Sequence, residues 1–133
     1  MTDEKKGNVL FVDDDTFLGG MYGLKFSSAG YNVQCCASVS DALAALHSGF
    51  AADAIVFDLT MPERDGFSFL EELSRDHLVP DAIRIALTNQ SNDAEKTKAQ
   101  SLGVQRFIVK ASMIPSEVVA AVGEEIAKRK KAS

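Results

Sequence analysis

The sequence predicts an α/β fold in which a parallel sheet is covered by helices on both faces. Short apolar segments, typical of buried strands, alternate along the chain with longer amphipathic segments, typical of helices. Strands that alternate with helices pair in parallel and need cover on both faces. Gly30, Gly49 and Gly103 fall where expected helices give way to loops, which suits residues that tolerate positive φ. With 133 residues, the chain is expected to form one α/β sandwich.

Five segments are expected to form the strands of this sheet. Residues 9–12, 54–57 and 107–109 are the strongest candidates, since each is an unbroken apolar run. Residues 32–36 and 83–87 are weaker candidates. Right-handed crossovers leave few arrangements for such a chain.

Five amphipathic segments lie between and after these strands, at residues 16–29, 40–48, 66–76, 92–102 and 115–130. The first has apolar residues at near-helical spacing, which predicts a buried face made of Phe17, Leu18, Met21, Leu24 and Phe26. Ser40 is the expected cap of the second helix.

Composition and charge exclude several classes of function. Fourteen Lys and Arg residues against nineteen Asp and Glu give a net charge of −5, which argues against nucleic acid or a membrane as a direct partner. The polar first eight residues do not resemble a signal peptide, and no apolar run could cross a bilayer. The adjacent Cys35 and Cys36 exclude an ordinary intradomain disulfide. We therefore expect a cytoplasmic protein.

The core pattern extends over about residues 7–127, so we expect a single domain over residues 1–133 with no room for a separate output domain. The basic residues 128–131 close the last helix, where cations favour the helix dipole. We expect them to be a solvated end, and we expect a monomer or a weak homodimer.

Residues with chemical potential cluster where the expected strands end. They are Asp13, Asp14 and Asp15 after the first strand, Asp58 after the third, Thr88 after the fourth and Lys110 after the fifth. Ligands of open parallel sheets bind at the carboxyl ends of the strands, so these side chains are expected to converge on one rim.

Several carboxylates in one pocket repel one another unless a proton or a cation intervenes. A hard divalent ion, for which Mg²⁺ is the first candidate, would relieve that repulsion and neutralise the charge of an incoming phosphoryl group. A carboxylate can then act as nucleophile and form an aspartyl phosphate. Lys110 would offset phosphoryl charge, and the Thr88 hydroxyl could bond a phosphoryl oxygen.

These motifs resemble the receiver domains of bacterial two-component response regulators. The matching segments are Val12-Asp13-Asp14-Asp15, residues 57–66 with Met61-Pro62 and Asp65-Gly66, Leu87-Thr88 and Val109-Lys110. The resemblance covers about residues 7–127. It implies a flavodoxin-like fold with strand order 2-1-3-4-5. It also implies Asp58 as the phosphoacceptor, with a histidine kinase or a histidine phosphotransfer protein as donor.

The resemblance also implies a metal site. Asp14 and Asp58 would ligate Mg²⁺ directly, with Mn²⁺ as the alternative ion. Asp13 would act through a metal-bound water, and the backbone carbonyl of Thr60 would complete the protein ligands. Asp15 is expected to cap a helix, because the family pattern needs only two carboxylates there.

Thr88 and Lys110 would sense the phosphoryl group, and Phe107 occupies the family's aromatic switch position. Such a protein phosphorylates and dephosphorylates its own aspartate, is no enzyme toward external substrates, and signals by binding an unknown target or by phosphorelay. Two departures stand beside the phosphorylation site. Ala111 replaces the family's cis proline after Lys110, and Asn89 replaces a small residue after Thr88.

Two alternatives remain open from sequence. A receiver-like interaction module that works without phosphorylation is motivated by the altered loops at Asn89 and Ala111. A phosphatase of the haloacid dehalogenase type would use Asp13 and Asp15 as an Asp-x-Asp pair, but Phe17 stands where that family has Thr or Val, and no cap domain is present.

Overall fold

The computed structural model describes residues 6–61, 64–89 and 92–132, and the side chains up to residue 129. Its sheet has five strands, all paired in parallel: β1 (Asn8–Val12), β2 (Asn32–Cys36), β3 (Ala54–Asp58), β4 (Ile83–Thr88) and β5 (Arg106–Val109). Their order across the sheet is β2-β1-β3-β4-β5. The expected fold class and strand order are confirmed.

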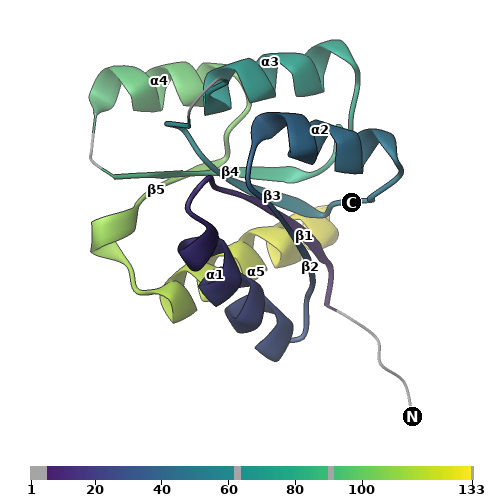
Figure 1. Ribbon diagram of the computed structural model, residues 1–133, viewed down its shortest axis with the longest axis vertical. Coiled ribbons are helices and arrows are strands. Elements are labelled where there is room, and N and C mark those ends of the chain that lie inside the picture. The colour runs from purple at the N-terminus through teal and green to yellow at the C-terminus, as the bar shows by residue number, and fades with distance from the viewer. Residues whose placement is uncertain (1–5, 62–63, 90–91, 133) are drawn as a thin grey trace.

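Helices cover both faces of the sheet (Figure 1). They are α1 (Thr16–Ser28), α2 (Val39–His47), α3 (Gly66–Arg75), α4 (Asp93–Ser101) and α5 (Pro115–Ala132), with a short 3-10 helix at Lys110–Ser112. α1 and α5 lie on one face, and α2, α3 and α4 lie on the other. No helix within the described residues is long and apolar enough to span a bilayer.

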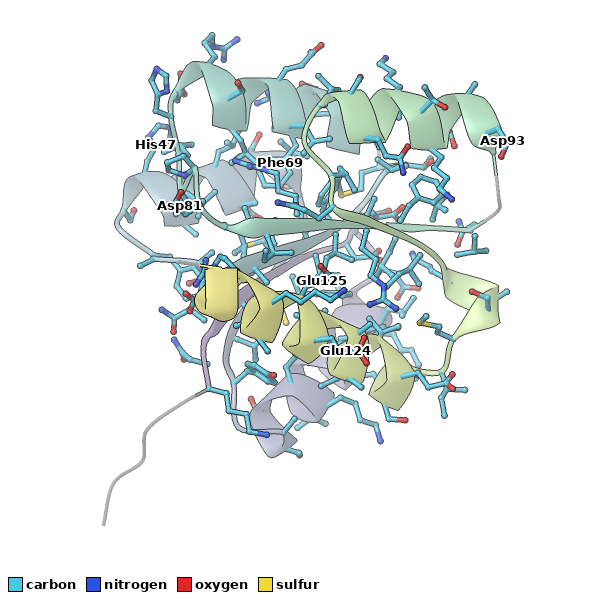
Figure 2. The ribbon with its side chains drawn as sticks, turned by 180° about the vertical axis from the view of Figure 1, so that it is seen from behind. His47, Phe69, Asp81, Asp93, Glu124 and Glu125 are labelled. Carbon is cyan, nitrogen blue, oxygen red and sulfur yellow. The ribbon has the colours of Figure 1, made fainter. Side chains whose placement is uncertain are left out.

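The core consists of one apolar cluster on each face of the sheet. β1 and β3 lie in the middle of the sheet and contribute alternate residues to the two clusters. On the side of α3, the ring of Phe69 lies between that helix and the sheet (Figure 2) and packs edge-to-face on Phe57, with ring centres 5.7 Å apart. The two buried central strands therefore give a rigid base to the loops at their carboxyl ends.

The buried face of α1 differs from the expected one. Phe17 and Leu24 are 82% and 72% exposed, whereas Tyr22 and Phe26 are buried against the sheet. The expectation was wrong for Phe17 and Leu24, because apolar residues occur all around this helix and spacing alone does not select a face. The absence of a side chain at Gly23 lets this side of α1 approach β2 closely, because a Cβ there would stand 3.2 Å from the Sγ atom of Cys35.

The cap of α2 also differs from the expectation. Ser38, not Ser40, accepts the hydrogen bond from the backbone N–H of Asp41, at 3.0 Å. Val39, between the two serines, is buried and lies in the first turn of the helix. Burial of that side chain places the cap two residues earlier than expected, and the helix begins at Val39.

Arg129 corrects the expectation of a solvated carboxyl-terminal end. Its side chain is 24% exposed, and its guanidinium binds the Asp53 carboxylate, with 2.6 Å between Nη2 and Oδ1. It also donates to the backbone carbonyls of Asp53 and Asp81, at 3.2 and 3.0 Å. The end of α5 is thus tied to the segments that lead into β3 and β4.

Replacing Arg129 by methionine should lower the free energy of unfolding by about 1.5–3 kcal/mol, the usual worth of a hydrogen bond to a charged group. Urea unfolding followed by circular dichroism measures this change. Lys128→Met is the matched control, because Lys128 is 72% exposed and its contact with Glu125 is 3.4 Å long. Equal losses in the two variants would contradict the structural role of Arg129.

Candidate phosphoacceptor site

The site lies on the rim where β1, β3 and β4 end. Asp13 follows the last residue of β1, Asp58 is the last residue of β3 and Thr88 is the last residue of β4. These three are the buried polar or charged residues of the part of the chain that the structure describes. The structure therefore brings together side chains that are far apart in the sequence, as the strand order requires.

Lys110 joins the two buried carboxylates. Its Nζ atom lies 2.9 Å from Oδ2 of Asp13 and 3.3 Å from Oδ2 of Asp58. The other oxygens of these carboxylates accept backbone hydrogen bonds, from Asp15 to Asp13 at 2.9 Å and from Thr60 to Asp58 at 3.0 Å. Each buried carboxylate is thus held in a fixed orientation by one ammonium contact and one N–H donor.

A third carboxylate, that of Asp14, stands at the open side of this pair. One ligand oxygen from each of Asp13, Asp14 and Asp58 lies within 4.8 Å of the others, and Asp14 is exposed. Three carboxylates face one ammonium in this group, which leaves two negative charges without a counter-charge inside it. An oxygen-only donor set with that excess suits a hard divalent cation, so the residues present fit Mg²⁺.

The electrostatics of the pair follow from burial and from Lys110. Burial raises the pKa of Asp58 above its usual value, although the Thr60 hydrogen bond and Lys110 act in the opposite direction. Burial alone would lower the pKa of Lys110, but the hydrogen bond to Asp13 and the charges of Asp58 and Asp13 raise it overall. Lys110 is therefore a cation at neutral pH, and it lies beside the carboxylates of Asp13 and Asp58.

The loop after Lys110 is rebuilt where the family has its proline. The bond from Lys110 to Ala111 is trans, and Lys110–Ser112 forms the 3-10 helix, in which the Ser112 hydroxyl donates to the carbonyl of Val109 at 2.7 Å. Lys110 nevertheless reaches both buried carboxylates. The departure at Ala111 changes the loop backbone without removing the lysine from the site.

The segment between β3 and α3 is anchored by capping and by an ion pair. Asp65 caps α3 by accepting from the N–H of Ser68 at 2.9 Å, and the N–H of Gly66 donates to the carbonyl of Leu59 at 3.0 Å. Arg64, which the sequence reading did not single out, binds Glu72 of α3 at 2.6 Å. This ion pair could not be predicted from the sequence, because its residues are eight positions apart and not the three or four typical of ion pairs within a helix. Residues 62 and 63 of the motif, Pro62 among them, lie outside the described residues.

Thr88 and Phe107 stand on neighbouring strands. Thr88 is paired in register with Val109 and Phe107 with Ala86, and Phe107 is partly buried against the core on the α3 side. Their switch roles stay a prediction. Asn89, after Thr88, is exposed.

Asp15 caps α1 by accepting from the backbone N–H of Leu18 at 3.1 Å, as expected from the sequence. Its carboxylate is thereby engaged outside the acidic group, unlike Asp13. An Asp-x-Asp catalytic pair of Asp13 and Asp15, which a phosphatase of the haloacid dehalogenase type would need, is not favoured by this arrangement.

Two apolar side chains near the site, Phe17 and Ile114, are exposed, and the sequence analysis did not identify either of them as exposed. Phe17 lies in the first turn of α1, and Ile114 lies just before α5 and is 61% exposed. Both elements begin a few residues after Asp13 and Lys110, which are in the site. The mismatch between apolar character and exposure emerges only once the buried face of α1 is known.

Comparison with known proteins agrees with this geometry. The profile of the response regulator receiver domain matches residues 9–122. The probable transcriptional regulator ycf27 of Guillardia theta is 28% identical over 130 residues, which are 98% of this chain and 49% of that protein. Regulatory protein VanRc of Enterococcus gallinarum is 28% identical over 118 residues, 89% of this chain and 49% of that protein. The chain thus spans about half the length of these relatives.

Solved structures share the whole architecture. A CheY-like receiver domain protein from Methanospirillum hungatei JF-1 superposes with a TM-score of 0.86 at 22% identity, covering 96% of this chain and 98% of that one. The non-phosphorylated HemR receiver domain from Leptospira biflexa gives a TM-score of 0.79 at 27% identity, over 90% of this chain and 94% of that one. With the profile match across most of its length, the chain belongs to the response regulator receiver domain family.

Proposed function

We propose that Asp58 accepts a phosphoryl group from a histidine kinase or a histidine phosphotransfer protein. The observation that carries this proposal is the buried carboxylate of Asp58, fixed between the Thr60 N–H and the Lys110 ammonium. A carboxylate held in one orientation beside a permanent cation can attack phosphorus while the charge on the phosphoryl oxygens is offset. The phosphorylated domain then signals by binding a downstream protein or by passing the group on.

In the transfer step, an oxygen of the Asp58 carboxylate forms a bond to phosphorus as the bond between phosphorus and the donor's imidazole nitrogen breaks. The electron pair of the broken bond stays on that nitrogen. Lys110 stabilises the negative charge that remains on the phosphoryl oxygens, and the Thr88 hydroxyl is available to bond one of them. Thr88 and the aromatic ring of Phe107 then carry the change to the surface near β4 and β5.

Receiver domains bind Mg²⁺ at their acidic pocket, and this chain has the acidic cluster for it. Asp13, Asp14, Asp58 and the backbone carbonyl of Thr60 would hold the ion, and Mn²⁺ would suit the same oxygens. A bound divalent ion neutralises charge on the transferring group. Activity is limited to the protein's own aspartate, with no external substrate.

The test is the intact mass of the protein after incubation with Mg²⁺ and acetyl phosphate as a small phosphodonor. We expect the mass of one phosphoryl group to be added, and we expect none in Asp58→Asn. Removing the ion with EDTA should abolish the adduct in the wild type. An unlabelled wild type, under conditions that label a known receiver domain, would refute the proposal and favour the phosphorylation-independent interaction module.

We expect a protein donor to dock on the exposed side chains of Phe17 and Ile114. Because they flank the carboxyl-end rim, replacing both by alanine should slow transfer from a phosphorylated kinase or phosphotransfer protein at least about tenfold, the effect of about 1.4 kcal/mol of lost contact. Transfer from acetyl phosphate should not change. Leu24→Ala, an equally exposed apolar side chain further along α1, is the matched control. Equal slowing with both donors would show that the double variant disturbs the site itself.

A further inference from the structure

A cavity lies at the rim opposite the acidic site, where α3 and α4 end and β4 begins. It has a volume of about 420 Å³, which is within the range of small-ligand sites. Its lining combines leucine side chains of α3 and the end of α4 with Ser74, His77, Arg84 and Ser101. Asp81 and Asp93, which precede and follow β4, are labelled at opposite sides of the molecule in Figure 2. This cavity is therefore well separated from Asp58.

Arg84 is an unusual residue for its position in β4. It is paired in register with Ile55 of β3. Its neighbours Ile83 and Ile85 are buried in the apolar cluster on the other face of the sheet, which α1 and α5 cover. Its backbone N–H donates to the side chain of Gln105 at 2.7 Å. Within the described part of the chain, however, its guanidinium makes no hydrogen bond or ion pair.

The cavity supplies no counter-charge to this cation. Its lining contains no aspartate or glutamate among the described residues. Burial lowers the pKa of Arg84, and no acidic group opposes that shift. A cation that is partly removed from water without a partner costs free energy that a bound anion would return.

The loop that borders the cavity is conformationally strained. His77 and Val79 have φ values of 53° and 34°, in the region that favours glycine. For the β-branched Val79 this conformation is a genuine outlier, and such strain concentrates at functional sites. The strained loop, the cavity and an arginine without a partner among the described residues thus meet in one place.

We propose that this cavity binds a small anion, a carboxylate or a phosphate, through Arg84. The guanidinium presents a planar fork of donors that matches either oxyanion in a bidentate manner. Ser74 and His77 add hydrogen-bonding groups, and the leucines enclose the apolar part of an organic anion. The carboxyl ends of α3 and α4 carry partial negative charge, which lowers the affinity of the site for an anion. We therefore expect the anion to bind weakly and reversibly.

The test is a titration of the full chain followed by ¹H–¹⁵N correlation spectra, after passage over a chelating resin so that the acidic site holds no divalent ion and no soluble chelator is present. Sodium phosphate and sodium succinate are titrated separately, against sodium chloride of equal ionic strength. We expect saturable shifts at the amides of Ser74, His77 and Gly103, and none at Gly30 near the amino-terminal end of β2. The tighter of the two probes tells whether the natural ligand is a phosphate or a carboxylate.

Variants assign the effect to the arginine. Arg84→Met should weaken binding at least tenfold, whereas Arg75→Met, which removes the same charge from the exposed surface of α3, should leave it unchanged. Ser74→Glu, which places a carboxylate at the cavity without touching the strand, should also compete with the anion. Shifts that chloride reproduces, that persist in Arg84→Met, or that fail to appear with either probe would overturn the proposal.

Discussion

Replacing Lys110 by methionine should slow phosphorylation of Asp58 by acetyl phosphate roughly 100- to 1,000-fold, the usual cost of removing one preorganised charge stabiliser. Lys110 is the cation that contacts both buried carboxylates, at 2.9 and 3.3 Å, and methionine keeps most of its length without its charge. The rate is measured from the intact mass as a function of time. In the wild type, the Lys110 ammonium also repels a divalent ion. Mg²⁺ should therefore bind the variant more tightly than the wild type, although the variant reacts more slowly.

The same substitution should lower stability when no divalent ion is present. Without Lys110, Asp13 and Asp58 are buried next to each other with no cation between them, and we expect a loss of about 2–3 kcal/mol. The figure lies below that of a fully buried pair because Lys110 is 17% exposed. Adding Mg²⁺ should restore more stability to the variant than to the wild type, since the ion binds only the folded state.

Lys25→Met, on the exposed surface of α1, is the matched control and should change neither rate nor metal affinity. Weaker Mg²⁺ binding in Lys110→Met would contradict this account, since it would mean that the lysine organises the carboxylates instead of competing with the ion.

Replacing Gly66 by alanine should lower the free energy of unfolding by about 1–3 kcal/mol, the usual cost of forcing extra volume into a packed place. A Cβ on Gly66 would stand 3.0 Å from the carbonyl oxygen of Asp58 and 3.0 Å from Cα of Leu59. Both are backbone atoms, so the start of α3 and the end of β3 would have to separate. We therefore expect slower phosphorylation as well, because Asp58 itself would move.

Gly20→Ala is the control for this prediction and should have the opposite sign. Gly20 lies in α1, and a Cβ there would meet no other group within 4 Å. Alanine then stabilises the helix by about 0.5–1 kcal/mol. Urea unfolding followed by circular dichroism compares the two variants. A stability gain in Gly66→Ala would show that the loop yields without strain.

The sheet was predictable because its strongest strands, β1 and β3, are almost uniformly apolar. Segments such as residues 54–57 are buried on both faces, and only a covered parallel sheet accommodates them. The convergence of Asp13, Asp58 and Thr88 followed from topology, since the carboxyl ends of parallel strands meet at one rim. The sequence did not reveal the distances within the site or the rebuilt loop at Ala111, because both depend on backbone geometry.

The errors concern features for which the local pattern was ambiguous. α1 has apolar residues on every side, so its exposed Phe17 and Leu24 were assigned to the core. Ser38 and Ser40 are equally good caps, and the burial of Val39 chose between them. Arg84 was read as an ordinary strand residue, because a missing ion-pair partner is visible only in three dimensions.

The contact between Arg129 and Asp53 sets a practical limit for anyone who expresses this domain alone. The family match ends at residue 122, and a fragment cut there would lose Ile126, which is buried in the core, as well as the tie to the segments before β3 and β4. Ending the domain directly after residue 122, at a fusion joint or a protease site, would therefore remove part of the fold itself. The safe boundary for a reporter or an affinity tag lies beyond Arg129.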